Sequence, residues 1–192
     1  MTGRRPGDSG TREAILAAAK EAFGSQGYAA TSLRSVARAA GVDPSLVTHY
    51  FGGKDGLFEA ALELPMEPGA LLAGLLDGPA GTLGERVVRT FLLVWDSLPG
   101  QGPMLAMLRG AVSHDDSAAK LRELLLRTLL LPLARGAGGD DAERRAALLA
   151  SQVVGLAMTR YVLKLEPIAS ASADELAPVM GKTLQRYLVG PL

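Results

Sequence analysis

The sequence predicts an all-α fold, with an N-terminal head of three helices that contains a helix-turn-helix and a C-terminal helical bundle. Apolar residues recur every three or four positions along most of the 192 residues, and no stretch alternates as a half-buried strand would. Glycine and proline separate these runs and mark where helices end. A hydrophobic content of 48% is ample for a buried core.

The chain is predicted to begin with a flexible arm, residues 1–10, that is rich in Gly, Pro, Ser and Arg. Two functions fit its arginines, Arg4 and Arg5, about equally well: contact with a nucleic acid, or simple solubility. A first helix is expected over residues 11–26, because one stripe holds its apolar side chains, and Gly27 is a suitable end. The stripe consists of Ile15, Ala18, Ala19, Ala22 and Phe23.

Two short helices joined by a tight turn are predicted between residues 31 and 51. Thr31 or Ser32 can cap the first of them, and Asp43 followed by Pro44 is typical of the start of the second. Gly41 can adopt the left-handed conformation that the turn requires. This arrangement is a helix-turn-helix, in which the second helix enters the DNA major groove.

Successive residues of a helix are rotated by about 100° around its axis, and this rotation gives the second short helix two different faces. Val47, Tyr50 and Phe51 lie on the inner face, and Leu46 lies on the flank. Ser45, Thr48 and His49 lie outside, where small polar groups and an imidazole suit contacts with base edges and phosphates. Each of them alone would be ordinary solvated surface, but the set within this frame favours DNA recognition.

A fourth helix is predicted to start at the sequence GGKD, residues 52–55. It is not a phosphate-binding loop, because Asp55 follows the lysine where that motif needs Ser or Thr. Lys54 and the free amides of the helix start are better suited to hold a DNA phosphate. Pro65 and Pro68 then end the helix. We therefore predict a helix-turn-helix DNA-binding domain at residues 11–64 and a ligand-binding and dimerisation domain at residues 69–192.

Charge and composition are consistent with this division. The net charge is zero, but residues 1–54 carry seven Lys or Arg and four acidic residues, which leaves +3 on the head and −3 on the remainder. The absence of cysteine excludes disulfides and thiolate metal sites. Because the sequence shows neither a signal peptide nor an apolar run of about 18 residues, we expect a cytoplasmic protein that does not enter the membrane.

Helices are expected in the body near residues 70–77, 82–98, 102–114, 116–135, 141–165 and 173–189. The segment LRELLLRTLLLPLA is apolar on several faces and should lie centrally, with Pro132 bending its last turns. The last two helices present an extra apolar face with small residues, which favours a partner. These small residues are Ala150, Ser151, Gly155 and Ala157.

Residues of the body suggest two further kinds of site. His114, Asp115 and Asp116 could form a metal or acid/base site, but helix capping explains them more simply. No nucleophile motif accompanies them, so we expect that the protein is not an enzyme and that it binds neither a cofactor nor a metal. A ligand pocket is the second possibility, oriented by Arg109 or Arg160. Its candidate lining is Phe91, Trp95, Met104, Met107, Leu108, Leu125, Met158 and Tyr161.

The sequence GVDPSLVTHYFGGKDGLF, preceded by SLRSVARAA, resembles the DNA-binding end of the tetracycline-repressor (TetR) family. Six positions match the family pattern in register: Gly41, Val42, His49, Tyr50, Phe51 and Lys54. Two positions differ from it, since Thr48 replaces a common aromatic residue and Pro44 a basic or small one. The resemblance covers roughly the N-terminal third of the chain.

The resemblance implies a homodimeric, ligand-responsive transcriptional regulator, more often a repressor, that binds palindromic operator DNA. It implies pairing through the helices near residues 141–165 and 173–189 and an unknown small-molecule effector. An all-helical small-molecule-binding or interaction module without sequence-specific DNA binding is the alternative, favoured by the neutral charge and by Thr48. The implied DNA-contacting residues are Thr31, Ser32, Arg34, Pro44, Ser45, Leu46, Thr48, His49, Tyr50 and Lys54.

Overall fold

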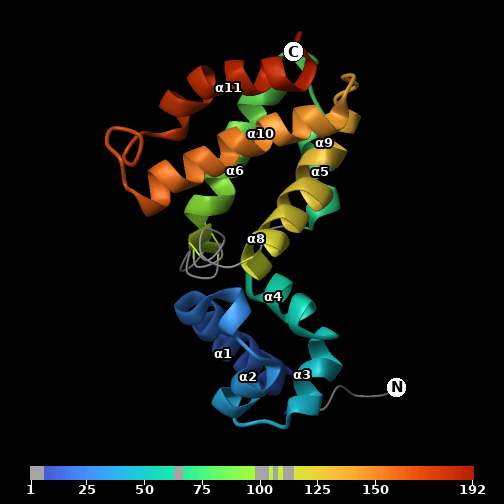
Figure 1. Ribbon diagram of the computed structural model, residues 1–192, viewed down its shortest axis with the longest axis vertical. Coiled ribbons are helices and arrows are strands. Elements are labelled where there is room, and N and C mark those ends of the chain that lie inside the picture. The colour runs from blue at the N-terminus through green and yellow to red at the C-terminus, as the bar shows by residue number, and fades with distance from the viewer. Residues whose placement is uncertain (1–6, 63–66, 98–103, 106–107, 110–114) are drawn as a thin grey trace. The chain divides into compact units, whose positions relative to one another are not determined.

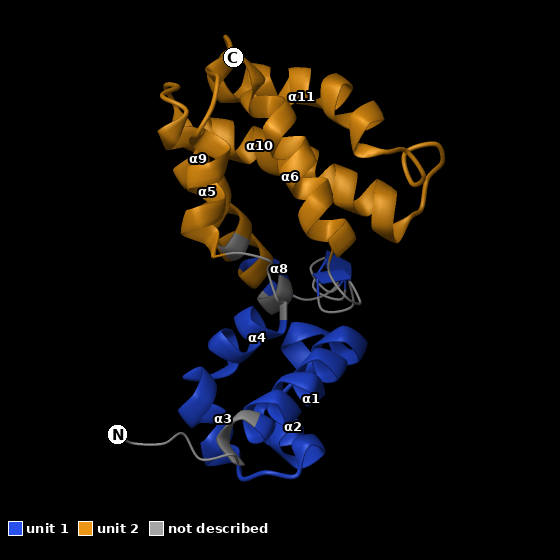
Figure 2. Ribbon diagram, turned by 180° about the vertical axis from the view of Figure 1, so that it is seen from behind, with its two compact units in different colours: residues 1–64, 99–119 blue, residues 65–98, 120–192 orange. Residues whose placement is uncertain are grey.

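The computed structural model of the chain describes residues 7–62, 67–97, 104–105, 108–109 and 115–192, and these residues contain helices but no strand (Figure 1). Contacts divide the chain into two compact units (Figure 2). The first unit comprises residues 1–64 and 99–119, and the second comprises residues 65–98 and 120–192. The sequence had placed residues 99–119 in the C-terminal domain. The division into a DNA-binding and a ligand-binding domain remains a prediction.

Four helices make up the described N-terminal part of the first unit: α1 (Gly7–Ala30), α2 (Leu33–Ala40), α3 (Pro44–Phe51) and α4 (Lys54–Leu62). Helical geometry in α1 is interrupted at Gly27, which has φ 78° and ψ 175°, as the sequence predicted for the end of the first helix. The core between the four helices consists of side chains that each helix turns inward: Ile15, Phe23, Val36, Val47, Leu57 and Phe58.

Tyr28 closes this small core from the connection that follows Gly27. Its ring lies 5.1 Å from that of Phe58, edge to face, and Phe58 packs in the same manner at 4.9 Å from Phe23. Edge-to-face pairs of this kind add to the stability gained from burial. The three rings therefore hold α4 against α1, which fixes the position of the turn between α3 and α4.

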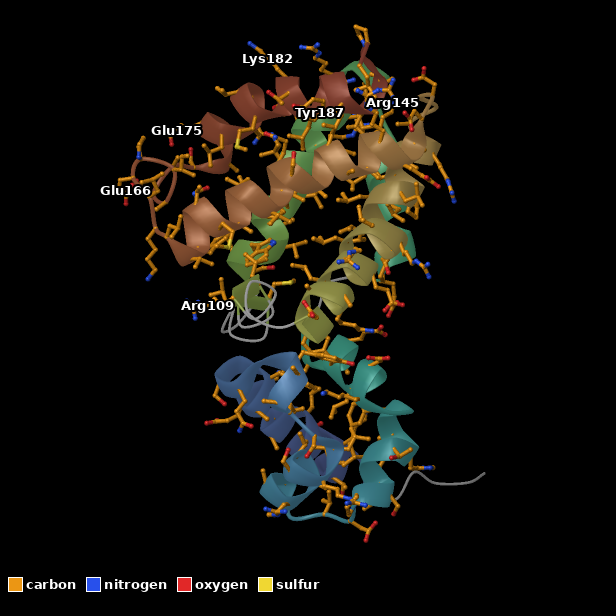
Figure 3. The ribbon with its side chains drawn as sticks, viewed as in Figure 1. Arg109, Arg145, Glu166, Glu175, Lys182 and Tyr187 are labelled. Atoms are coloured by element: carbon orange, nitrogen blue, oxygen red, sulfur yellow. The ribbon has the colours of Figure 1, made fainter. Side chains whose placement is uncertain are left out.

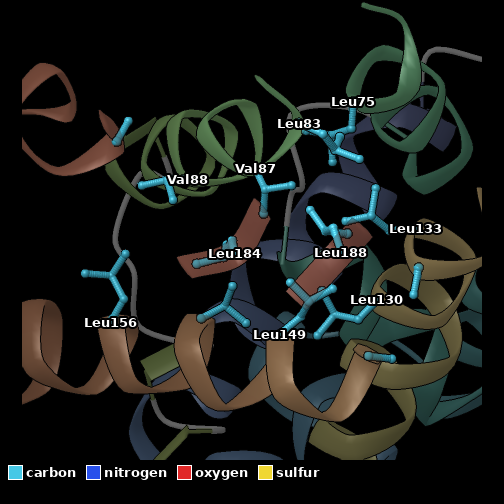
Figure 4. Close-up of a cluster of buried hydrophobic side chains, with 14 of the residues drawn as sticks. Leu75, Leu83, Val87, Val88, Leu130, Leu133, Leu149, Leu156, Leu184 and Leu188 are labelled. Atoms are coloured by element: carbon cyan, nitrogen blue, oxygen red, sulfur yellow. The ribbon is translucent and has the colours of Figure 1, made fainter. Parts of the chain in front are cut away.

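The second unit contains α5 (Pro68–Leu76), η1 (Ala80–Thr82), α6 (Leu83–Ser97), α9 (Leu131–Gly136), α10 (Ala142–Ala157) and α11 (Ala173–Val189). The helix α8 (Asp115–Arg122) continues without a break through the π-helical segment η2 (Glu123–Leu130) into α9. Residues from α5, α6, α9, α10 and α11, together with Leu130 of η2, form one apolar core (Figure 4). Its most deeply buried large members are Val88, Leu92, Leu133, Leu149, Leu184 and Leu188.

Two helices of the body contain wide turns. The segment η2 lies just before Pro132, whose ring lacks an N–H group and crowds the carbonyl four residues earlier, so the helix widens there. The helix α10 widens at its C-terminal end into η3 (Met158–Val162). The predicted helix over residues 141–165 therefore ends about three residues early, because Lys164 has a left-handed conformation with φ 51°.

Glycines bring α6 and α11 into backbone contact. A Cβ atom added at Gly84 would lie 2.2 Å from the carbonyl oxygen of Gly181, and one added at Gly181 would lie 2.7 Å from the Cα atom of Glu85. The Gly84 amide donates to Oε1 of Gln185 at 2.8 Å, and Nε2 of Gln185 donates to the Ala80 carbonyl at 2.8 Å. This crossing anchors α11 along α6.

A buried arginine ties the C-terminal end of α11 to the start of α10. Arg145 is 4% exposed, and its guanidinium donates to the backbone carbonyls of Asp140, Tyr187 and Gly190 and to the Asp140 carboxylate (Figure 3). The carbonyls at the end of a helix lack partners within the helix, so a cation there is favourable. Arg145 thus serves as a side-chain cap for α11.

None of the helices in the described part of the chain is both long enough and apolar enough to cross a membrane.

Candidate nucleic-acid interface

The helix α2 is held by caps at both ends. Ser32 and Ser35 form a reciprocal capping box, in which each backbone amide donates to the other residue's hydroxyl at 3.1 Å. Gly41 ends the helix in the left-handed conformation with φ 68° and ψ 31°. The sequence predicted a cap by Thr31 or Ser32 and a left-handed Gly41, and Ser32 is the residue that caps the helix. The two caps fix the tight turn that leads into α3.

The helix α3 also starts and ends as the sequence predicted. Asp43 is the N-cap, Pro44 follows as the first helical residue, and left-handed Gly52 closes the helix. Val47 is fully buried and Phe51 is 9% exposed, so this face packs inward. The opposite face of α3 is exposed and holds Ser45, Thr48 and His49, together with Pro44 at its start.

Asp43 and Ser45 form a closed pair at the beginning of the exposed face. Oδ1 of Asp43 accepts from the Ser45 amide at 2.8 Å and from the Ser45 hydroxyl at 2.5 Å. Both hydrogen bonds lower the pKa of the Asp43 carboxyl, and the one from the hydroxyl has the larger effect. The carboxylate is therefore charged at neutral pH and directs the hydroxyl proton of Ser45 toward itself.

Lys54 stands at the start of α4 on an aromatic support. Its ammonium lies 4.4 Å from the centre of the Tyr28 ring and donates to the Ala29 carbonyl at 3.2 Å. The Tyr28 hydroxyl in turn donates to the Asp55 carboxylate through a short hydrogen bond. These contacts hold the lysine at the end of the turn that follows α3.

The other predicted DNA-contacting residues differ in exposure. Ser32 and Arg34 are exposed, whereas Leu46 and Tyr50 are half-buried, with the Tyr50 ring 5.3 Å from that of His49. Thr31 is 1% exposed, and its hydroxyl donates to the Gly27 carbonyl at 2.8 Å. Thr31 therefore secures the connection between α1 and α2, and its hydroxyl does not face solvent.

Arg12 is a residue of this region that the sequence did not single out. Its guanidinium lies 5.2 Å from the centre of the Phe51 ring, although its own side chain is exposed. The contact brings a positive charge from α1 to the end of α3. No local pattern could indicate it, because the two residues lie far apart in the sequence and belong to different helices.

Part of the predicted ligand-pocket lining comes together in the second unit. The Trp95 ring stacks on that of Tyr161 at 4.8 Å and lies 5.6 Å from that of Phe91. Leu125 and Met158 are half-buried in the same unit. Met104 and Leu108 are buried but belong to the first unit, and Met107 and His114 lie outside the described residues. The pocket as a whole remains a prediction.

Arg160 is the inward-directed member of the two candidate arginines, whereas Arg109 is exposed. Its guanidinium donates to the carbonyls of Ile168 and Ala171 at 2.8 and 2.7 Å, and it lies 3.5 Å from the carboxylate of Asp96. Its Nε is buried without a hydrogen-bond partner among the described residues.

Asp96, which the sequence did not single out, also accepts from the Tyr161 hydroxyl at 2.8 Å. Burial, followed by this hydrogen bond, raises the pKa of Tyr161, so its hydroxyl remains protonated.

The chain matches two family models that together cover both parts of it. Residues 15–61 match the family model of bacterial regulatory proteins of the tetR family, and residues 81–188 match that of the tetracyclin repressor-like C-terminal domain. The HTH-type transcriptional regulator BetI of Rhizobium meliloti is 31% identical over 171 residues, which cover 82% of this chain and 81% of that protein.

Solved structures give the same result. A TetR-family regulator from Streptomyces coelicolor A3 is 41% identical, with a TM-score of 0.69 over 97% of this chain and 99% of that one. NalD of Pseudomonas aeruginosa shares the fold at 21% identity, with a TM-score of 0.62 over 98% of this chain and 100% of that one. The exposed face of α3, the capped turn before it and these matches together show that the chain belongs to the TetR family of bacterial transcriptional regulators.

Proposed function

We propose that this regulator is a homodimeric repressor that binds a palindromic operator through α3 and responds to a small-molecule effector. The observation that carries the proposal is the face of α3 on which Ser45, Thr48 and His49 are exposed while Val47 is fully buried behind them. Such a face can enter the major groove without disturbing the core. Ser45, Leu46, Thr48 and His49 would contact bases.

The surroundings of α3 supply the phosphate contacts of this proposal. Tyr50 lies near the end of α3, and Lys54, supported on Tyr28, is the first residue of α4. Ser32, the N-cap of α2, and Arg34, within α2, are exposed. Contacts with phosphates fix the register of a protein on the duplex, whereas contacts with base edges select the sequence. Thr31 is omitted from the proposed contacts because its hydroxyl is buried.

Dimerisation is proposed through α10 and α11. Ser151 and Gly155 are exposed one turn apart on α10, and Val179 is 69% exposed on α11. Exposed apolar and small side chains of this kind allow two helices to approach closely. Two recognition helices read a palindrome when they are about one DNA turn apart, roughly 34–36 Å, which requires a fixed dimer.

The effector is proposed to bind near the aromatic residues of α6 and η3. Phe91, Trp95 and Tyr161 supply ring surface, and the buried Nε of Arg160 is an unused donor within the described residues. A polar or anionic group on the ligand would satisfy that donor. The effector lowers operator affinity only if it binds the DNA-incompetent conformation more tightly. The protein is proposed to act in the cytoplasm, where its operator DNA lies.

The double substitution His49→Ala and Lys54→Ala is expected to weaken operator binding by about 100-fold, since it removes one base contact and one phosphate contact in each protomer. Fluorescence anisotropy with a labelled operator measures this loss. Arg135→Ala is the matched control, because it removes an exposed positive charge from α9 and should leave affinity within about twofold. Equal operator affinity of a folded double variant and the wild type would refute the proposed interface.

A further inference from the structure

The recognition face of α3 presents hydrogen-bond acceptors, rather than donors, at its N-terminal end. Pro44 has no amide proton, the Ser45 amide donates to Oδ1 of Asp43, and the Leu46 amide donates to the Asp43 carbonyl at 3.0 Å. The donors that usually make a helix N-terminus attractive to a phosphate are thus used within the chain. A negative charge, that of Asp43, occupies this end instead.

The single proton of the Ser45 hydroxyl is also engaged. A hydroxyl has one proton and two lone pairs, and the Ser45 proton lies in a 2.5 Å hydrogen bond to the Asp43 carboxylate. A hydrogen bond to a charged acceptor is stronger than one between neutral groups, so turning this proton toward DNA would cost free energy. Ser45 therefore faces outward as an acceptor only. No described residue donates a hydrogen bond to the second carboxylate oxygen of Asp43, Oδ2. This oxygen is therefore a second acceptor beside the Ser45 hydroxyl.

Base pairs differ in the groups that they show in the major groove. Cytosine N4 and adenine N6 carry donor amines, whereas guanine N7 and O6 and thymine O4 are acceptors. A neutral serine with a free hydroxyl can serve either kind of group. An outward face made of lone pairs and a carboxylate attracts an amine and repels an acceptor.

We propose that Asp43 fixes Ser45 as an acceptor, so that α3 reads an exocyclic base amine, either cytosine N4 or adenine N6, at one position of each operator half-site. This inference rests on the proposed function, because it concerns the base chemistry that the same helix recognises. Ser45 is the base-contacting residue, and Asp43 is a positioning residue that acts through it.

The test starts from the operator that the wild-type protein selects. At each adenine of one half-site, purine removes only the N6 amine, and at each cytosine, pyrimidin-2-one removes only the N4 amine. Affinities of the wild type and of Ser45→Ala are compared on each duplex. Because both proteins bind the same modified DNA, the weakened base pair cancels in the ratio.

We expect amine removal at one position to weaken the wild type about fivefold more than Ser45→Ala, the effect of one hydrogen bond of about 1 kcal/mol. The analogue that produces this effect tells whether the amine belongs to cytosine or to adenine. Coupling of Ser45 to guanine N7, detected with 7-deazaguanine, or no coupling at any amine, would overturn the proposal.

Asp43→Gly tests the positioning role separately. Glycine is nearly as good an N-cap as aspartate, so α3 is retained, which circular dichroism confirms. The Ser45 hydroxyl, freed from Asp43, should then either accept or donate a hydrogen bond. The preference for the amine-bearing base over guanine at that operator position should therefore fall about fivefold. An unchanged preference would show that Asp43 does not set it. If the wild type selects no palindrome, both this inference and the proposed function fail, whereas a palindrome without Ser45 coupling refutes this inference alone.

Discussion

Gly84→Ala is expected to lower the free energy of unfolding by about 3 kcal/mol, because the added methyl group has no room between α6 and α11. The new Cβ atom would lie 2.2 Å from the Gly181 carbonyl oxygen and 2.4 Å from the Gln185 amide nitrogen. Both are backbone atoms, so relief requires α11 to move rather than a side chain to rotate. Urea unfolding followed by circular dichroism at fixed protein concentration measures the change.

Gly74→Ala is the matched control for this substitution. Gly74 lies in α5 with nothing within 4 Å of an added Cβ atom, so alanine should be neutral or stabilise by about 0.5–1 kcal/mol through its higher helix propensity. Similar unfolding midpoints for Gly84→Ala and Gly74→Ala would show that α6 and α11 do not cross as closely as the structure places them.

Arg145→Met is expected to destabilise the protein by about 3–4 kcal/mol. Methionine can fill the space of the arginine stem, but the carbonyls of Tyr187 and Gly190 at the end of α11 lose their donor. Arg145 also holds the pKa of Asp140 below its usual range through a hydrogen bond and charge attraction. We therefore expect that pKa to rise toward its ordinary value in the variant, as carboxyl NMR titration would show.

The neighbouring Arg144 provides the comparison, since its side chain is exposed and only its amide takes part in capping α10. Arg144→Met should change stability by less than about 0.5 kcal/mol. Equal losses in the two variants would indicate a general effect of removing charge from this segment, and would contradict the capping role of Arg145.

The sequence predicted the features of the DNA-binding helices that depend on local chemistry. Gly41 is left-handed and Asp43–Pro44 starts a helix for reasons contained in those residues themselves. The two-faced character of α3 follows from helical periodicity, so the outward direction of Ser45 and His49 was also predictable. The same periodicity placed most body helices within about three residues of their observed bounds.

Features that depend on tertiary contact were not predictable. Gly84 lies inside the helix that the sequence predicts over residues 82–98, and its contact with Gly181 depends on how α6 crosses α11. The sequence predicted that Thr31 contacts DNA. In the structure the chain bends at Gly27, and the Thr31 hydroxyl donates to the Gly27 carbonyl instead. Arg145 lies near the start of the helix that the sequence predicts over residues 141–165. Nothing local indicates its role, because the carbonyls that it caps belong to another helix.

The central claim, that α3 reads a palindromic operator from a dimer, is tested most directly by selection of bound duplexes from a random DNA pool. The purified full-length protein is used at about physiological salt, because affinity for DNA depends strongly on salt. We expect enrichment of one palindrome with half-sites about one helical turn apart, bound by two protomers. No enriched sequence from a folded dimer, with only weak salt-dependent binding, would contradict this claim and favour a ligand-binding module.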